Sequence, residues 1–303
     1  MNQLAIIIPA YKASFLAASL ESITSQTCKD FTLYIGDDCS PYDLESIVKK
    51  HQDKINIVYK RFEANLGAKD LVAQWERCID LNQGEEWLWL FSDDDIMAPN
   101  CVEDFYKTQK KHPEDKLFHF NINVINADGK LLHSSEQWPE HCTTKRYLDG
   151  KLSAKGFITY VVEFIIHRDI FFGAGRFQNY DLAWGSDFVS WVKFSNLNNG
   201  ICTISDARIS WRDSGENISP NHNSNIIYRK MKSVIRSVKF ITDFAKIHHY
   251  GRPWFYGKYA LGEIRRNRDI LSKQQLSSLS DDYNQVNHFK FPLSFMSKIL
   301  FRK

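Results

Sequence analysis

The chain has 303 residues, of which 43% are hydrophobic and 25% are charged, and its formal net charge is +3. This composition is ordinary for a globular protein with a real core, and no stretch approaches the roughly 18 uninterrupted apolar residues of a membrane span. The charge is uneven, however. Residues 1–219 carry 23 basic and 31 acidic side chains, a net charge of −8, whereas residues 220–303 carry 16 and 5, a net charge of +11. Two parts of opposite sign indicate two separate tasks.

The cysteines and the N-terminus indicate the compartment. The six cysteines lie at positions 28, 39, 78, 101, 142 and 202, with neither a C-x-x-C pair nor the spacing of a zinc site. This scatter favours reduced thiols. The segment MNQLAIIIPAYKAS has no basic leader and Pro9 interrupts its apolar run, which favours a strand over a signal peptide. We therefore expect a cytoplasmic protein.

Short apolar strands alternate with helices over the first hundred residues. The strands that the pattern predicts are Leu4–Ile8, Phe31–Ile35, Ile55–Tyr59 and Trp87–Phe91, and helical segments with one apolar face follow the first three. A helix after Pro99, a strand at Leu117–Ile125 and a late strand at Thr203–Trp211 complete this part. Strands and helices that alternate in this way predict an α/β fold with a doubly wound, mostly parallel sheet flanked by helices.

The remaining segments are less regular or clearly helical. Residues 130–180 are rich in aromatic side chains and show no clear periodicity, and a helix is expected to begin near Asp187. The pattern from Asn225 to Phe244 is helical and basic. We therefore predict a first domain over residues 1–219, divided near residue 100, and a basic helical C-terminal region over residues 220–303.

Acidic or polar residues follow three of the predicted strands, as Pro9-Ala10-Tyr11, Asp37-Asp38 and Asp93-Asp94-Asp95. In an open α/β sheet, ligands bind beyond the carboxyl ends of the strands. The Asp37-Asp38 pair alone would be compatible with a turn or a helix cap. Three consecutive aspartates after an apolar strand repel one another, and a divalent cation is the usual compensation. A metal site is therefore favoured over a solvated turn.

The order IIIPAY, DDCSP, NLG and WLWLFSDDDIMAP resembles the large family 2 of inverting GT-A glycosyltransferases. The resemblance covers roughly residues 1–215, and it implies the GT-A fold and a nucleotide-sugar donor, by default a UDP-sugar. In that family the first Pro-x-Tyr segment and the strand-end aspartate hold the nucleotide base. The resemblance therefore implies that Pro9, Tyr11 and Asp38 do so here.

The family's D-x-D metal motif is not matched literally. Its last aspartate usually lies five residues before a proline, and Pro99 gives that position to Asp94. The resemblance then implies Asp94 as the main metal ligand, Asp93 as the ribose contact and Asp95 as a further metal group. A literal Asp93-x-Asp95 motif is the alternative. The cofactor would be Mn²⁺ or Mg²⁺, bound by carboxylate and diphosphate oxygens.

Two further segments resemble family loops beside the diphosphate. Asn65 and Gly67 match an Asn-x-Gly loop, where Gly67 lets the backbone approach the nucleotide and Lys69 meets phosphate; an ordinary turn is the alternative. Arg212 lies in the equivalent of a closing loop and would clamp phosphate. Many relatives carry a metal-binding histidine in that loop, which is absent here unless His222 serves.

Inversion requires a base that removes the proton of the acceptor hydroxyl. The family places an acid at the start of the helix after the aromatic segment, and Asp187 in WGSDFVSW matches it, with Asp181 as the weaker candidate. A helix N-cap is the alternative role for Asp187. Trp184 and Trp191 are either a platform for the sugar or core residues.

These features together predict an inverting glycosyltransferase that acts on a saccharide or lipid-linked saccharide in bacterial surface polysaccharide or lipopolysaccharide synthesis. A sugar nucleotidyltransferase and a non-catalytic nucleotide-sugar or lipid-binding protein are the alternatives, and no nucleic-acid partner is expected. The basic residues and apolar anchors of 229–303 suit an anionic membrane surface, on the inner face of the cell membrane. Alternatively, these helices pack on the acidic part of the chain.

Overall fold

The computed structural model describes residues 3–153, 157–198, 200–215, 223–250 and 253–286. The chain divides into two compact units. Unit 1 consists of Met1–Thr144, Ile158–Phe177 and Ser190–Glu216, and unit 2 of Lys145–Phe157, Gln178–Val189 and Asn217–Lys303. Two short internal segments thus belong with the C-terminal helices in one compact unit.

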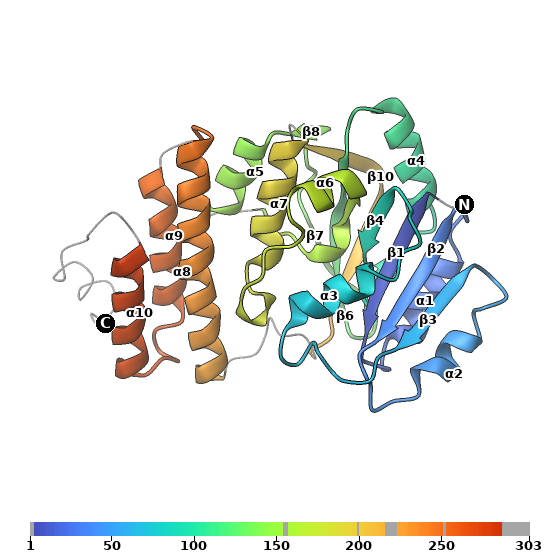
Figure 1. The fold of residues 1–303 in the computed structure, drawn as a ribbon, viewed down its shortest axis with the longest axis horizontal. Helices are drawn as coiled ribbons and strands as arrows, with labels where there is room; N and C mark the ends of the chain where they lie inside the picture. The colour runs from blue at the N-terminus through green and yellow to red at the C-terminus, as the bar shows by residue number, and fades with distance from the viewer. Residues whose placement is uncertain (1–2, 154–156, 199, 216–222, 251–252, 287–303) are drawn as a thin grey trace. The chain divides into compact units, whose positions relative to one another are not determined.

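A single sheet of ten strands, counted over the described residues, forms the centre of unit 1 (Figure 1). Its main order is β3-β2-β1-β4-β9-β6-β10-β5, with β7 paired to β6 and β8 paired to β10. The strands in chain order are β1 (Leu4–Ala10), β2 (Phe31–Asp37), β3 (Ile57–Arg61), β4 (Trp87–Leu90), β5 (Ile96–Met97), β6 (Leu117–Asn126), β7 (Leu131–Ser134), β8 (His141–Cys142), β9 (Phe164–His167) and β10 (Ile201–Asp213).

The sheet is mostly parallel, which confirms the predicted α/β class. Strand β1 pairs in parallel with β2 and β4, β2 pairs in parallel with β3, and β6 pairs in parallel with β10. The exception at the centre is β9, which lies between β4 and β6 and is antiparallel to both. This strand falls within the aromatic-rich segment whose sequence showed no clear periodicity. Because β1 is parallel to both β2 and β4, the carboxyl ends of these three strands lie on the same side of the sheet.

Helices cover both faces of this sheet. Those that lie wholly in unit 1 are α1 (Leu16–Thr24), α2 (Leu44–Lys49), α3 (Leu71–Ile79), α4 (Cys101–Lys111) and α6 (Arg168–Gly173). One core combines alternate residues of β1, such as Ile6 and Ile8, with buried side chains of α1, α2 and α4. Helix α3 contacts β1, β2 and β4. It approaches closely at Gly36, where an added Cβ would lie 2.3 Å from Cys78 Sγ.

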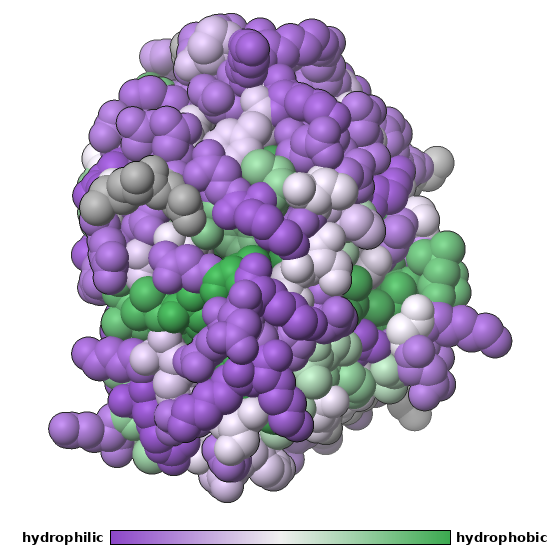
Figure 2. Space-filling view, turned by 90° about the vertical axis from the view of Figure 1, so that its right-hand side faces the viewer, coloured by the Kyte–Doolittle hydropathy of each residue, from purple (hydrophilic) through white to green (hydrophobic). Residues whose placement is uncertain are grey.

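Strand β3 is an edge strand of the sheet, and within the described part of the chain its only neighbour in the strand order is β2. Figure 2 views the molecule from this side and shows a mostly hydrophilic surface with apolar side chains visible only in limited areas. Lys60 and Arg61, the last residues of β3, are exposed. Charged side chains on an outer strand oppose pairing with another chain.

Unit 2 is mainly helical. It contains most of α5 (Thr144–Lys151), the one-turn helix η2 (Asp181–Ala183), the first turn of α7 (Ser186–Leu197), and α8 (Ser224–Ile247), α9 (Pro253–Arg266) and α10 (Lys273–Val286). Helices α9 and α10 pack against α8 (Figure 1). Their contact buries apolar side chains such as Val238, Ile264 and Leu279. The predicted C-terminal helices are therefore confirmed.

No helix in the described ranges is both long and apolar enough to cross a bilayer. The last part of the predicted membrane-binding segment, residues 287–303, lies outside the described residues.

Candidate active site

The aspartate triplet after β4 is buried. The exposed fractions of Asp93, Asp94 and Asp95 are 5%, 5% and 1%. Asp93 Oδ2 accepts hydrogen bonds from the backbone N–H groups of Tyr11 and Lys12, both at 2.8 Å. The backbone N–H of Arg212 donates to Asp95 Oδ1 at 2.7 Å. The triplet therefore connects the loop after β1 to the end of β10.

Lys12 supplies positive charge to this triplet. Its ammonium group donates to Asp94 Oδ2 and lies 3.8 Å from Asp93 Oδ1. Burial lowers the pKa of Lys12, but the charges of the three aspartates outweigh this effect, and the net pKa is raised. Sequence reasoning gave Lys12 no role, although it directly follows the Pro-x-Tyr segment.

One ammonium group does not fully compensate three buried carboxylates. Burial raises the pKa of Asp93 to about 6 although the charge of Lys12 opposes the shift, and burial together with the charge of Asp94 also raises the pKa of Asp95. Ser92 Oγ lies 2.8 Å from an oxygen of Asp94 and 2.8 Å from an oxygen of Asp95, yet a hydroxyl has only one proton to donate. The donor set, hard carboxylate oxygens short of positive charge, therefore fits Mn²⁺ or Mg²⁺.

Arg212 lies against the triplet and is 4% exposed. Its guanidinium donates to the backbone carbonyls of Asp94 at 2.8 Å, Asn126 at 3.1 Å and Ala127 at 2.7 Å. It also stacks over the ring of Phe15, 4.7 Å from the centroid. These contacts tie the backbone of Asp94 to the backbone at the end of β6. The phosphate-clamp role stays a prediction, and His222 lies outside the described residues.

Asp37 and Asp38, at the end of β2, have different environments. Asp37 is fully buried and accepts hydrogen bonds from Tyr59 Oη at 2.6 Å and Arg61 at 2.7 Å. Asp38 accepts the backbone N–H groups of Leu66 at 2.7 Å and Gly67 at 2.8 Å, and it pairs with Arg77. Asp37 thus stabilises the sheet edge, whereas Asp38 holds the Asn65–Gly67 loop.

The geometry gives Gly67 a specific reason to be glycine. A Cβ at this position would lie 2.7 Å from Asp38 Oδ2. Asn65 Oδ1 accepts the backbone N–H of Ala68 at 2.9 Å, as in a turn, and Lys69 is exposed. Tyr11 is 40% exposed and Pro9 is half-buried. The contacts of these residues with a nucleotide stay predictions.

Asp187 lies in unit 2, in the first turn of α7, and is half-buried. Burial raises the pKa of its carboxyl, although the charge of Lys151 and a hydrogen bond from the N–H of Phe188 oppose the shift. The carboxyl group thus caps backbone N–H groups and also has the raised pKa of a group suited to accept a proton. Capping and proton transfer are compatible roles for Asp187.

The loop before Asp187 has an unusual backbone. Leu182 and Ala183 adopt φ angles of 59° and 53°, in the left-handed region, and Gly185 follows at 85°. Each non-glycine residue in the left-handed region raises the conformational free energy of the folded chain by roughly 1–2 kcal/mol. The backbone N–H of Tyr180 donates to Ser186 Oγ at 2.9 Å, which closes the loop on the start of α7.

Helix α8 holds this loop in place. Arg229 donates through Nε and a terminal nitrogen to the two carboxylate oxygens of Asp181, at 2.8 and 2.6 Å. Ser233 Oγ donates to the carbonyl of Asp181 at 3.0 Å, and Lys230 Nζ lies 4.5 Å from the ring centroid of Trp184. Side-chain hydrogen bonds from Arg229 lower the pKa of Asp181, so this aspartate is a poor base.

Trp191 is a core residue. It is 1% exposed and stacks on Phe164, with ring centroids 4.2 Å apart. The sugar-platform hypothesis therefore does not hold for Trp191.

Comparison with known proteins gives the family. A family model described as "Glycosyl transferase family 2" matches residues 5–171. An uncharacterized glycosyltransferase of Haemophilus influenzae is 28% identical over 155 residues, which are 48% of each chain. One of Rickettsia prowazekii is 24% identical over 201 residues, 64% of this chain and 58% of the relative. The chain spans about half the length of the curated relatives it matches.

Solved structures share the fold. S. aureus TarS 1–349 in complex with UDP-GlcNAc has a TM-score of 0.56 and 15% identity, over 94% of this chain and 90% of TarS 1–349. Mannosyltransferase PcManGT from Pyrobaculum calidifontis, in complex with GDP-Man and Mn²⁺, has a TM-score of 0.53 and 12% identity, over 97% and 78%. The predicted GT-A fold is confirmed.

The contact between helix α8 and the loop before Asp187 can be tested by substituting Arg229. Arg229→Ala should accelerate amide hydrogen exchange at residues 182–186 by about fivefold, because the half-exposed bidentate pair contributes up to about 1 kcal/mol. Asp181→Asn should have a similar effect, and the double variant should add little to either. Lys239→Ala, which removes the Lys239–Asp243 pair at 2.8 Å on the same helix, is the control. Unchanged exchange in Arg229→Ala would show that the loop does not depend on this pair.

Proposed function

This chain belongs to glycosyl transferase family 2, and we propose that it transfers a sugar from a nucleoside-diphosphate sugar to an acceptor hydroxyl with inversion at the anomeric carbon. The observation that carries the proposal is the buried aspartate triplet at the end of β4, where the loop after β1 and the end of β10 meet. A site with excess buried negative charge suits a divalent cation and the diphosphate bound to it.

The metal would be Mn²⁺ or Mg²⁺, held mainly by Asp94 with Asp95 beside it. When bound, such an ion neutralises charge that develops on the departing nucleoside diphosphate. Lys12 already pairs with Asp94 and is well placed to share in that neutralisation. Asp93, held by the N–H groups of Tyr11 and Lys12, would position the ribose.

The nucleotide base would lie beside Pro9, Tyr11 and Asp38. The exposed face of Tyr11 suits stacking, and Asp38 orders the Asn65–Gly67 loop from which Lys69 extends. UDP is the proposed nucleotide. The complexes of TarS with UDP-GlcNAc and of PcManGT with GDP-Man support a nucleoside-diphosphate sugar as donor. We propose a saccharide of a bacterial surface polysaccharide or lipopolysaccharide as acceptor.

Asp187 would act as the base. The acceptor oxygen forms a bond to the anomeric carbon as the bond from that carbon to the diphosphate oxygen breaks, and the hydroxyl proton passes to the Asp187 carboxylate. The raised pKa of Asp187 suits this proton transfer. The contacts of Arg229 and Ser233 with the preceding loop support the position of the Asp187 carboxylate.

Attachment to an anionic membrane through residues 229–303 stays a prediction. Several basic side chains of this region form ion pairs inside unit 2, including Lys232 with Asp282 at 3.5 Å and Lys246 with Asp243 at 3.6 Å. Sedimentation with anionic vesicles, lost on deleting residues 287–303 or on adding salt, would support attachment. An absence of sedimentation would exclude it under those conditions.

Asp94→Asn tests the metal proposal. It should weaken Mn²⁺-dependent UDP binding at least about tenfold and abolish transfer, because the main carboxylate ligand is lost. Asp95→Asn should have a smaller effect. The measurement is calorimetric titration of UDP with and without Mn²⁺, together with release of nucleotide from the donor. Full transfer in EDTA, or by Asp94→Asn, would contradict the proposal.

Asp187→Asn tests the base. Donor binding should persist while the rate falls by at least about 10²-fold, since an amide cannot accept the proton. Because burial raises the pKa of Asp187, the rate of the wild-type enzyme should fall on acidification at a higher pH than an exposed aspartate would give. The residual rate of the variant should lack that acid limb. Asp206→Asn, at an exposed position of β10, is the control. A collapse of donor affinity with an unchanged rate at saturation would make Asp187 structural.

A further inference from the structure

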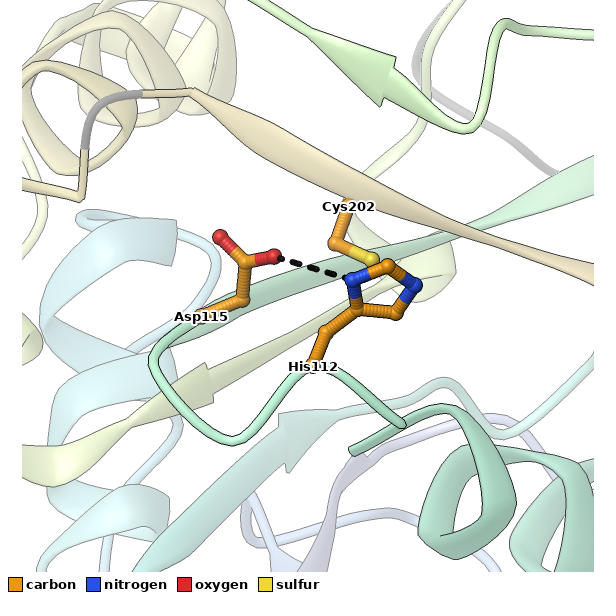
Figure 3. A group of neighbouring side chains, drawn as sticks. All are labelled: His112, Asp115 and Cys202. Atoms are coloured by element: carbon orange, nitrogen blue, oxygen red, sulfur yellow. Dashed lines mark ion pairs between the residues drawn. The ribbon is translucent and has the colours of Figure 1, made fainter. Parts of the chain in front are cut away.

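A second group of metal-ligand side chains lies at the start of β10. His112 is the C-cap residue that follows α4, Asp115 lies in the turn before β6, and Cys202 is the second residue of β10. One ligand atom from each of the three residues lies within 4.8 Å of the others. Figure 3 shows the three side chains pointing toward one another.

His141 provides a fourth ligand-type side chain. It pairs with Cys202 in the antiparallel β8–β10 ladder, so the two side chains lie on the same face. His141 Nε2 is 3.8 Å from Asp115 Oδ1, and His112 Nδ1 is 4.0 Å from Asp115 Oδ2. The Asp115 carboxylate thus lies between two imidazoles.

These separations are close to those of a tetrahedral zinc site. Zinc binds histidine, aspartate and cysteine at about 2.0–2.3 Å, which places neighbouring ligand atoms about 3.3–3.8 Å apart. The two histidine contacts of Asp115, 3.8 and 4.0 Å, lie at or just above this range, and the ligand atoms of His112, Asp115 and Cys202 lie within 4.8 Å of one another, so a bound ion would draw the group together. Asp115 and Cys202 are 7% and 1% exposed, whereas the His141 side chain is 43% exposed.

The surrounding residues also suit a bound ion. Glu140 Oε1 lies 3.3 Å from His112 Nε2, the ring nitrogen that faces away from Asp115. In zinc sites a hydrogen bond from this nitrogen to a carboxylate commonly orients the ring and leaves the other nitrogen for the ion. Here the 3.3 Å contact is an ion pair that lacks the geometry of that hydrogen bond. Asn198 Nδ2 donates to Asp115 Oδ1 at 3.4 Å. Glu140 Oε1 also forms an ion pair with Lys111 Nζ at 2.5 Å.

We propose that His112, Asp115, His141 and Cys202 bind one Zn²⁺ ion in a structural site separate from the donor site. Mixed nitrogen, sulfur and oxygen donors favour zinc over Mg²⁺ or Ca²⁺. The ion cross-links the turn before β6 to β8 and to the start of β10, the strand whose other end carries Arg212. Sequence spacing gave no zinc pattern because the ligands come from three separate segments.

Cobalt substitution tests the site. The probe is Co²⁺ added to metal-free protein carrying Asp94→Asn, which removes the main ligand of the donor site. One equivalent should produce a thiolate-to-cobalt charge-transfer band that Zn²⁺ abolishes. Zinc should also raise the unfolding temperature by at least about 3 °C, since it binds only the folded state.

Variants of the group and of matched residues decide the outcome. Cys202→Ser and His141→Ala should lose the band and the temperature shift. Cys101→Ser, at another buried thiol, and His133→Ala, at an exposed histidine of β7, should keep both. If Cys202→Ser does not fold, His141→Ala decides between the outcomes. The His141 side chain is partly exposed, so its removal should not prevent folding. No band in the parent protein, or a band that survives His141→Ala, would overturn the proposal and leave the donor-site proposal untouched.

Discussion

Burial of three adjacent carboxylates at the end of β4 is the constraint on which the structure of unit 1 depends. Isolated buried charges are strongly unfavourable, so each carboxylate needs donors or a counter-charge. Asp93 obtains two backbone N–H groups from the loop after β1, Asp94 obtains the ammonium of Lys12, and Asp95 obtains the N–H of Arg212. These contacts join the ends of three strands and leave the site short of positive charge.

Charged side chains near the triplet also form hydrogen bonds with backbone groups and so hold the surrounding loops. Asp38 organises the Asn65–Gly67 loop through two backbone N–H groups, and Gly67 must be glycine because the carboxylate occupies the place of a Cβ. The guanidinium of Arg212 donates to the backbone carbonyl of Asp94 and to two carbonyls at the end of β6, and so links the triplet to that strand. Asp38 and Arg212, for which the sequence motifs predict contacts with the donor, thus also hold the protein backbone. In unit 2, Arg229 and Ser233 stabilise the strained loop before Asp187 in the same manner.

The sequence predicted the parallel strands, the helices and the position of the aspartate triplet, because apolar periodicity and strand-end acids are local signals. It did not predict β9, since four residues within an aromatic-rich segment carry no periodicity and their antiparallel place between β4 and β6 is set by tertiary packing. Lys12 was missed because a lone lysine in a loop has no distinctive pattern. Nor could the pairing of Asp181 with Arg229, 48 positions apart, be inferred from spacing.

We propose that a divalent cation completes the aspartate triplet at the end of β4. The most direct measurement is the anomalous scattering of manganese in crystals grown with Mn²⁺ and UDP. The proposal predicts an anomalous peak within coordination distance of the Asp94 carboxylate and of the diphosphate oxygens, with the ammonium of Lys12 no longer the main partner of Asp94. UDP bound without such a peak, and with Lys12 still paired to Asp94, would contradict it.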